Sequence, residues 1–408
     1  MQADSLLLEE LPVSRRRLRV SLITETYPPE INGVAMTLGH LVLGLQARDH
    51  QVQLIRPRQG REAPPADMAN LEQILRPGFP IPRYAGLNMG LPAKRLLFKR
   101  WSVRQPDVVH IATEGPLGWS ALAAANKLRI PVVSGFHTNF HSYSSHYGFG
   151  WLKKPIHVYL RKFHNQTRLT LVPTRQLGIE LSRAGYRNVE VLSRGVDQRL
   201  FNPGKRSAAL RQEWGVADNT PAVIHVGRIA PEKNLGLLIR AFEAIEATRP
   251  GARLILVGDG PSLAALKHSH PRFVFRGARV GEDLASHYAS ADIFLFPSVT
   301  ETFGNTLTEA MASGLACLGY DYAAASEHIR QGDNGVKVRL HDEPAFIDQA
   351  RWLAEHPEAI GPLGAGARET MKALSWEDIY DQLEGYYLRV IREREASQDR
   401  AVRKSGFS

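Results

Sequence analysis

The chain has 408 residues, of which 43% are hydrophobic and 23% are charged. Because this length exceeds what one hydrophobic core usually supports, the sequence predicts two domains of roughly 200 residues each. The apolar content excludes an intrinsically disordered chain. A single cysteine, Cys317, excludes an intramolecular disulfide and a cysteine-based metal site, and it favours a reducing compartment. We expect Cys317 to be an ordinary buried strand residue, since it lies in the apolar run LACLGY.

Membrane spans and export signals are not predicted. No stretch approaches about 20 uninterrupted apolar residues, and the first residues include acidic side chains where a signal peptide needs positive charge. We therefore expect a cytoplasmic protein.

Positive charge is concentrated in the first half of the chain. Residues 1–200 hold 27 Lys and Arg against 14 Asp and Glu, whereas residues 201–408 hold 24 against 27. Two basic clusters also contain apolar and aromatic residues, LLFKRW at 96–101 and GFGWLKKPIHVYLRKF at 148–163. This mixture suits peripheral binding to an anionic membrane surface, and ordinary solvated helix faces stay an alternative. A nucleic-acid partner is not expected, because no RNP-like or zinc motif is present.

Short β-branched runs alternate with helical periods along the whole chain. Strands are expected in the first half at 18–24, 51–57, 106–112, 131–137, 169–174 and 188–193, and in the second half at 221–228, 252–258, 272–278, 292–298, 315–320 and 335–340. This alternation predicts an α/β protein with two parallel sheets, each covered by helices. The predicted division is a disordered N-terminus at 1–17, a first domain at 18–200, a linker at 201–218, a second domain at 219–374 and a final helix at 375–397.

The turns that follow the strands are the places to look for a ligand, because open α/β sheets bind ligands beyond the carboxyl ends of their strands. In the first such turn, Gly33 lets the backbone approach a ligand, and the start of the following helix suits a phosphate. After the strand at 221–228, Arg228 and Lys233 stand five residues apart just before a helix. Two cations at this position predict a clamp for a diphosphate.

The most specific pattern is SVTETFGNTLTEAMASG, which runs from a strand end through a glycine turn into a helix near Asn305. Glu301 is expected in the turn and Glu309 about one turn into the helix, so both carboxylates can face one cleft. The backbone N–H groups near Gly304, Asn305 and Thr306 would point at an anion. One carboxylate suits sugar hydroxyls and the other a ribose diol, because an ionised carboxylate only accepts hydrogen bonds.

A further candidate is His137, at the end of a strand in the basic half, which suits hydrogen bonding to a sugar or assistance to a proton transfer. Other chemistries find no support in the motifs. The run GDGPSL lacks the third glycine of a dinucleotide turn, and the sequence has no P-loop and no GxSxG. It also has no Asp-x-Asp pair to hold a metal against a nucleotide, so no metal and no other cofactor is expected.

These motifs together resemble the retaining glycosyltransferases of family 4, also called glycosyl transferases group 1, which have the GT-B fold of two facing Rossmann-like domains. The resemblance rests on ETFGNTLTE, GRIAPEKNL, LILVGDGP, FRGARVGEDLASHYASADIFLFPS, SRGVDQRLFNP and ETYPPEINGVA, and it covers roughly residues 18–390. It implies a metal-independent hexosyltransferase that uses a nucleotide sugar. Within the family, HTNFHSYSSHYGFGWLKK is similar to bacterial GDP-mannose-dependent α-mannosyltransferases and to enzymes that glycosylate diacylglycerol.

The resemblance also implies a role for each candidate residue. Gly33 would lie against the donor diphosphate, Arg228 and Lys233 would bind it, and Glu309 would bind the ribose. Glu301 and the backbone N–H groups of Phe303 and Gly304 would hold the sugar hydroxyls, while His137 would face the donor sugar. The nucleotide base would be read near three residues after a strand, Gly277, Ala278 and Arg279. The helix at 375–397 would return to the first domain.

The expected activity is therefore transfer of a hexose, from GDP-mannose or next from UDP-glucose, to a lipid or glycan acceptor at the inner face of the membrane. Front-face attack, in which the leaving phosphate accepts the proton of the acceptor, is the mechanism that the resemblance implies. Two alternatives remain, a nucleotide-sugar epimerase with the same two-domain fold and a protein that binds a nucleotide sugar without turnover.

Overall fold

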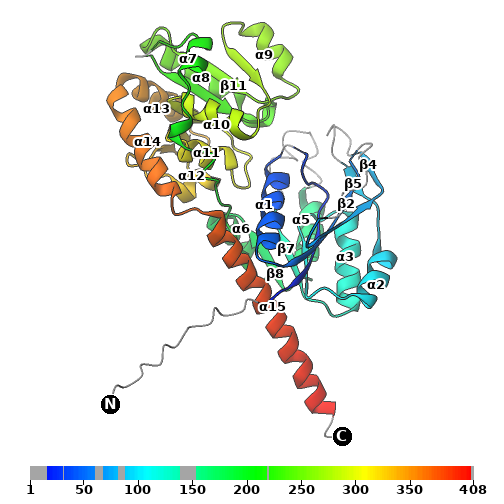
Figure 1. Ribbon diagram of the computed structural model, residues 1–408. Coiled ribbons are helices and arrows are strands. Elements are labelled where there is room, and N and C mark those ends of the chain that lie inside the picture. The colour runs from blue at the N-terminus through cyan, green and yellow to red at the C-terminus, as the bar shows by residue number, and fades with distance from the viewer. Residues whose placement is uncertain are drawn as a thin grey trace, which may run out of the picture.

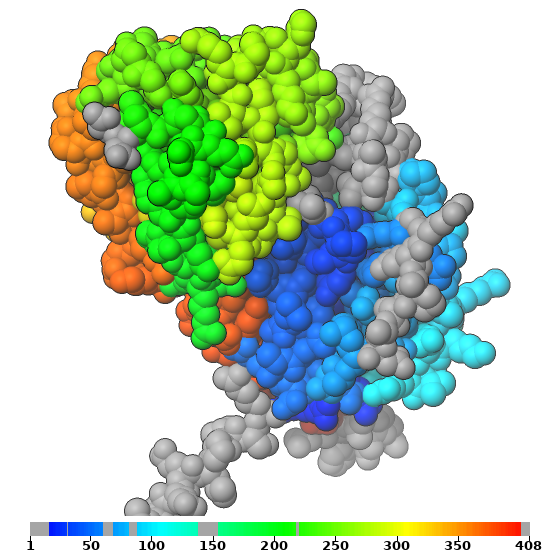
Figure 2. All heavy atoms as spheres, turned by 45° about the horizontal axis from the view of Figure 1, so that its top comes forward, coloured from blue at the N-terminus to red at the C-terminus, as the bar shows by residue number. Residues whose placement is uncertain are grey.

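The computed structural model describes residues 16–30, 32–59, 68–80, 88–137, 153–217 and 220–405. The described residues form two α/β halves joined by a long C-terminal helix (Figure 1). Most of the N-terminus predicted to be disordered lies outside them, as does most of HTNFHSYSSHYGFGWLKK. In the space-filling view, the first half (blue) and the second half (green to yellow) meet along one boundary (Figure 2).

The first half is built on a parallel sheet of seven strands. In spatial order these are β3 (Leu71–Arg76), β2 (Gln51–Pro57), β1 (Arg19–Ile23), β6 (Val108–Ile111), β7 (Val132–Gly135), β8 (Leu169–Val172) and β9 (Val189–Val191). Its helices are α1 (Gly33–Ala47), α2 (Lys94–Val103), α3 (Pro116–Lys127), α5 (Lys153–His164) and α6 (Arg175–Arg183). A short antiparallel pair, β4 (Gly78–Pro80) and β5 (Asn88–Gly90), stands beside the sheet.

The six strands predicted for this half are all present, and β3 is an addition to them. Its sequence, LEQILR, has one buried residue, Leu71, and otherwise partly or fully exposed ones. An edge strand of this kind has no continuous apolar run, so the pattern that reveals the central strands is missing.

The second half repeats the plan with six parallel strands. In spatial order these are β12 (Val274–Gly277), β11 (Arg253–Val257), β10 (Ala222–Val226), β13 (Ile293–Phe296), β14 (Ala316–Tyr320) and β15 (Val336–Val338). Its helices are η2 (Pro203–Lys205), α7 (Ala208–Glu213), η3 (Pro231–Lys233), α8 (Leu235–Thr248), α9 (Leu263–Ser269), α10 (Gly281–Ser290), α11 (Asn305–Ala312), α12 (Ala323–His328), α13 (Glu343–Glu355) and α14 (Pro357–Met371). Cys317 is fully buried in β14, as predicted.

Each sheet has a hydrophobic core on both faces. In the first half, α1 and α15 (Trp376–Ser405) cover one face, whereas α2 and α3 cover the other. In the second half, α10, α11 and α14 pack on one face, and α8 and α13 on the other. Near-continuous burial of strands such as β6, β10 and β14 is what a parallel sheet covered on both sides requires.

The final helix, α15, leaves the second half and packs against the first (Figure 1). Tyr387 on α15 is buried, and its hydroxyl lies 2.7 Å from Nδ1 of His110 on β6. The helix approaches α1 so closely that a Cβ on Gly44 would lie 2.5 Å from the ring of Tyr380. The predicted end near residue 397 was too early, because α15 continues to Ser405. The charged run QDRAVRK lacks an apolar stripe but consists largely of residues that tolerate a helix.

Candidate functional site

The loop after β13 brings the N-terminus of α11 to the boundary between the halves. Gly304 precedes α11 with φ of 110°, and a Cβ there would lie 2.9 Å from the ring of Phe296. Only glycine fits both the backbone conformation and the close contact. No side chain caps α11, so its first N–H groups have no side-chain acceptor. The start of a helix left in this way is suited to an anion.

The N-terminus of α1 meets that of α11 across the boundary. Nδ2 of Asn305 donates to the carbonyl oxygen of Gly33 over 3.4 Å. Asn32 caps α1 by accepting from the backbone N–H groups of Val34 and Ala35, at 3.1 Å and 2.8 Å. A Cβ on Gly33 would lie 3.6 Å from Nη1 of Arg194 and 3.8 Å from Nδ2 of Asn305. Gly33 and Asn305 are both predicted site residues and are 272 residues apart in the sequence. The structure brings them into contact.

The two predicted cations, Arg228 and Lys233, lie in the loop and short helix η3 that follow β10. Each contacts a carboxylate. Nη1 of Arg228 lies 2.8 Å from Oε1 of Glu232, and Nζ of Lys233 donates to Glu301. Lys233 and Glu301, which come from turns after different strands, are therefore part of one site, and Lys233 reaches the loop that leads into α11.

The two predicted glutamates have opposite electrostatic environments. Burial pushes the pKa of Glu301 upward, but the charge and hydrogen bond of Lys233 and the charge of Arg194 hold it below its usual value. Glu301 is therefore ionised at neutral pH. Burial raises the pKa of Glu309 to about 7, although Tyr288 donates its hydroxyl to Oε2 over 2.9 Å. Glu309 is consequently poised between its neutral and charged forms near physiological pH.

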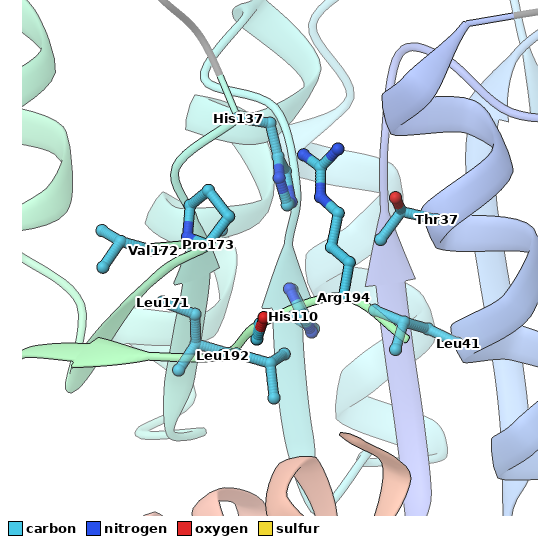
Figure 3. A pocket seen from close by; sticks show the side chains of 11 residues that line it. Thr37, Leu41, His110, His137, Leu171, Val172, Pro173, Leu192 and Arg194 are labelled. Atoms are coloured by element: carbon cyan, nitrogen blue, oxygen red, sulfur yellow. The ribbon is translucent and has the colours of Figure 1, made fainter. Parts of the chain in front are cut away.

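His137 follows β7 and faces a small cavity in the first half (Figure 3). Both ring nitrogens are buried and have no hydrogen-bond partner among the described residues. Burial holds the pKa of His137 well below its usual value, and the charges of Arg194, His110 and His164 lower it further. The imidazole is therefore neutral at physiological pH. A Cβ on Gly135 would lie 2.4 Å from Nε2 of His137, so the glycine makes room for this ring position.

The residues predicted to read the base lie at the end of β12 and in the loop before α10. Gly277 has φ of +68°, and a Cβ there would meet nothing within 4 Å, so the space beside it is open. Arg279 donates from Nε to the carbonyl oxygen of Arg276 and forms an ion pair with Asp283 at 2.9 Å. This loop is connected to the glutamate site through α10, because Tyr288 near the end of α10 donates to Glu309.

Two predicted residues remain, Phe303 and Thr306, and they differ in burial. Phe303 is 1% exposed as a whole residue, so its ring belongs to the core, whereas Thr306 is partly buried in the first turn of α11. Sequence reasoning assigned no role to Arg194 or Tyr288, which contact Asn305 and Glu309. Arg194 follows β9 and lies in the run SRGVDQRLFNP. Because ligands bind beyond the carboxyl ends of strands, its position after a strand could have identified it as a candidate.

No group of three or more His, Cys, Asp and Glu side chains is placed to hold a metal ion within the described ranges. Over the same part of the chain, no helix combines the length and the apolar character needed to cross a bilayer.

Comparisons with known proteins agree with this architecture. The family model described as Glycosyltransferase Family 4 matches residues 31–200, and the model described as Glycosyl transferases group 1 matches residues 220–356. A GDP-mannose-dependent alpha-mannosyltransferase of Corynebacterium glutamicum is 31% identical over 383 residues, covering 92% of this chain and 90% of the relative. An alpha-monoglucosyldiacylglycerol synthase of Acholeplasma laidlawii is 29% identical over 400 residues, covering 92% and 98%.

Among solved structures, sucrose-phosphate synthase from Thermosynechococcus elongatus superposes with a TM-score of 0.75 at 19% identity. The match covers 92% of this chain and 100% of that chain. This likeness confirms the predicted GT-B fold, with two Rossmann-like halves and a C-terminal helix.

Proposed function

The chain belongs to glycosyltransferase family 4, and from this premise we propose that it transfers a hexose, with retention of configuration, to a lipid or glycan acceptor at the inner face of a membrane. The family assignment establishes a glycosyltransferase that uses a nucleotide sugar. The donor, the stereochemical course, the independence from metal and the membrane location are part of the proposal.

One observation carries the proposal: two helix N-termini from different halves meet beside an ionised carboxylate and several cations. Gly33 of α1 and Asn305 of α11 are in contact, and Lys233 pairs with Glu301 in the adjoining loop. Helix N-termini and cations bind a diphosphate, while a carboxylate that only accepts hydrogen bonds suits sugar hydroxyls. The juxtaposition therefore fits a nucleotide diphosphate sugar.

The proposed mechanism is electrostatic. Lys233, Arg228 and the first N–H groups of α11 would stabilise the negative charge that develops on the departing diphosphate. These groups supply positive charge of the kind that a metal ion supplies in other transferases, so we propose that no metal is needed. The neutral imidazole of His137 would hydrogen-bond the transferring sugar. The leaving phosphate would accept the proton of the acceptor hydroxyl during front-face attack.

The proposed donor is GDP-mannose, with UDP-glucose as the next choice. The order follows the identity of the relatives, since the GDP-mannose-dependent mannosyltransferase is 31% identical to this chain and the alpha-monoglucosyldiacylglycerol synthase is 29% identical. The open space beside Gly277 is where the base would lie.

The proposed membrane contact lies on the basic helices of the first half. On α5, Lys154, Arg161 and Lys162 are exposed together with Val158 and Tyr159, whose exposed fractions are 54% and 43%. Cations beside exposed apolar side chains suit an anionic bilayer surface. The related diacylglycerol enzyme supports a lipid acceptor for a protein that binds there.

A donor screen tests the activity directly. We would measure thermal shift and donor hydrolysis with GDP-mannose, UDP-glucose, UDP-galactose and UDP-GlcNAc, with and without vesicles that contain diacylglycerol and anionic lipid. One nucleotide sugar should stabilise the protein and be consumed faster with lipid. A donor that binds without turnover under every condition would favour the non-catalytic binder, and release of an epimerised nucleotide sugar would favour the epimerase.

The membrane surface is tested by removing charge. The triple substitution Lys154→Gln, Arg161→Gln, Lys162→Gln should weaken binding to anionic vesicles by about 1 kcal/mol per charge removed, and leave donor hydrolysis in solution unchanged. Its matched control removes three exposed cations of the second half, Arg272, Arg351 and Lys372. If both triple variants bound vesicles equally well, the basic residues of α5 would be an ordinary solvated helix face and not a membrane-binding surface.

A further inference from the structure

Arg194 occupies an unusual position for a charged side chain. It follows β9 in the first half, and its guanidinium lies beside the ring of His137 at the cavity shown in Figure 3. The residue is only 4% exposed. Nη1 donates to Oδ1 of Asn305 over 3.1 Å, so the side chain reaches from the first half to the N-terminus of α11 in the second. Its Cζ lies 5.4 Å from the centre of the Phe303 ring.

The guanidinium is left largely without partners. Nε and Nη2 are buried and have no hydrogen-bond partner among the described residues. Burial lowers its pKa to about 10, and the charge of Glu301 partly offsets that effect. The side chain therefore stays charged at neutral pH. Its only hydrogen bond in the described part of the chain is the one to the neutral amide of Asn305.

A buried, charged guanidinium whose single hydrogen bond goes to a neutral amide is costly, because the charge has lost its hydration and the charge of Glu301 offsets only part of that loss. Sites that break a local rule of stability in this way are commonly functional. A further partner of the guanidinium would be negative. It would lie near the starts of α1 and α11, because Nη1 donates to Asn305 and lies 3.6 Å from the position of a Cβ on Gly33. A phosphate meets both requirements.

We propose that Arg194 is a further donor-binding residue, supplied by the first half, whose guanidinium binds the phosphate attached to the transferred sugar. The inference rests on the proposed function and adds to it a cation from the opposite side of the boundary. In the reaction, the bond between the anomeric carbon and the phosphate oxygen breaks, and its electron pair stays on that oxygen. The acceptor oxygen bonds to the carbon, and its proton passes to the phosphate, whose charge Arg194 stabilises.

Two consequences follow from this placement. Because Arg194 contributes to the low pKa of His137, it helps to keep that imidazole neutral beside the sugar. Because the same guanidinium touches Asn305, a phosphate bound to it would contact both halves at once. A merely structural tie between the halves would explain the bond to Asn305 but not the two unpartnered nitrogens.

The test compares ligands with and without the second phosphate. We would measure affinities of the full-length protein for GDP, GMP, UDP and UMP by calorimetry, using wild type, Arg194→Gln and Arg194→Lys. Arg194→Gln should weaken binding of the preferred diphosphate at least 10-fold and change binding of its monophosphate less than 2-fold. Arg194→Lys should recover part of the loss, because it restores the charge without the planar fork.

The matched control is Arg368→Gln, because Arg368 also ties segments together, through the backbone carbonyls of Phe201 and Ala312. It should lower the melting temperature without separating diphosphate from monophosphate. If wild type binds GDP or UDP and Arg194→Gln loses nothing, or loses both ligand types equally, the role of Arg194 is refuted and the proposed function stands. If wild type binds no nucleoside diphosphate, both proposals fail. Arg194→Lys supplies the comparison should Arg194→Gln not fold.

Discussion

The two halves of the molecule present their polar groups to the common boundary in different ways. In the second half, Lys233 pairs with Glu301, and Glu309 accepts a hydrogen bond from Tyr288. In the first half, no described residue forms a hydrogen bond with either ring nitrogen of His137 or with two of the three guanidinium nitrogens of Arg194. The second half thus holds its site in shape by internal contacts, whereas His137 and Arg194 of the first half have nitrogens that no described residue satisfies.

Breaking the ion pair between Lys233 and Glu301 in the second half should have the largest effect on activity. Lys233→Ala removes a cation from the proposed diphosphate site and leaves Glu301 without its ion-pair partner. We expect kcat to fall by about 10²–10³-fold, as when one preorganised group that stabilises a developing charge is removed. Steady-state transfer with the donor found in the screen measures this loss.

The control for that substitution is Lys372→Ala, which removes an exposed lysine of the second half that pairs with a neighbouring glutamate, Glu369. Its kcat should equal that of wild type. A Lys233→Ala variant with near-normal kcat would show that the pair with Glu301 merely shapes the loop.

The raised pKa of Glu309 predicts that donor affinity depends on pH, which tests the site of the second half separately from that of the first. Because burial raises this pKa to about 7, the carboxyl group gains its charge between pH 6 and 8. A charged carboxylate accepts the ribose hydroxyls more strongly, so affinity for GDP-mannose or UDP-glucose should rise between about pH 6 and pH 8 and then level off. Glu309→Gln should bind about 10-fold more weakly at pH 8 and lose this pH dependence. Calorimetry at several pH values measures both effects.

The same shift affects stability with a defined sign. As pH rises, the unfolded chain releases the Glu309 proton near the ordinary glutamate pKa of 4.5, whereas the folded chain releases it near pH 7. The free energy of unfolding should therefore fall as pH rises from about 4.5 to about 7. Glu25 serves as a control, because burial also raises its pKa to about 7. Glu25→Gln should change the stability profile but keep the pH dependence of donor affinity. Loss of that dependence in both variants would remove Glu309 from its proposed role.

The contrast between the halves also explains what the sequence revealed. Glu301, Gly304 and Glu309 lie within nine residues, on one turn and the helix after it, so their spacing alone predicted a shared site. In the first half, Gly33, His137 and Arg194 come from three distant turns. Only the strand order of the folded sheet brings such turns together.

Side-chain partners were the part that the sequence left open. The pattern of strands and helices predicted two parallel sheets, because hydrophobic periodicity is a local property. It did not predict that Lys233 contacts Glu301 or that Arg194 crosses to Asn305, because such contacts depend on loop conformation and on how the halves meet. One such loop feature is the conformation of Gly304, which has a positive φ and packs closely against Phe296. It helps to set where the loop between Glu301 and α11 lies.

We expect the smallest effect on activity from a substitution at the contact between α15 and α1. The same substitution should have a clear effect on stability. A Cβ on Gly44 of α1 would lie 2.5 Å from the Tyr380 ring of α15, so Gly44→Ala must push the helix or the ring away. We expect the free energy of unfolding to fall by about 1–3 kcal/mol, the usual cost of overpacking. Gly385→Ala, also on α15, adds a Cβ that meets nothing within 4 Å and should instead stabilise by about 0.5–1 kcal/mol. Urea unfolding of both variants measures the difference. If Gly44→Ala were as stable as Gly385→Ala, α15 would be loosely held, and the first half would not depend on the helix that reaches it from the second.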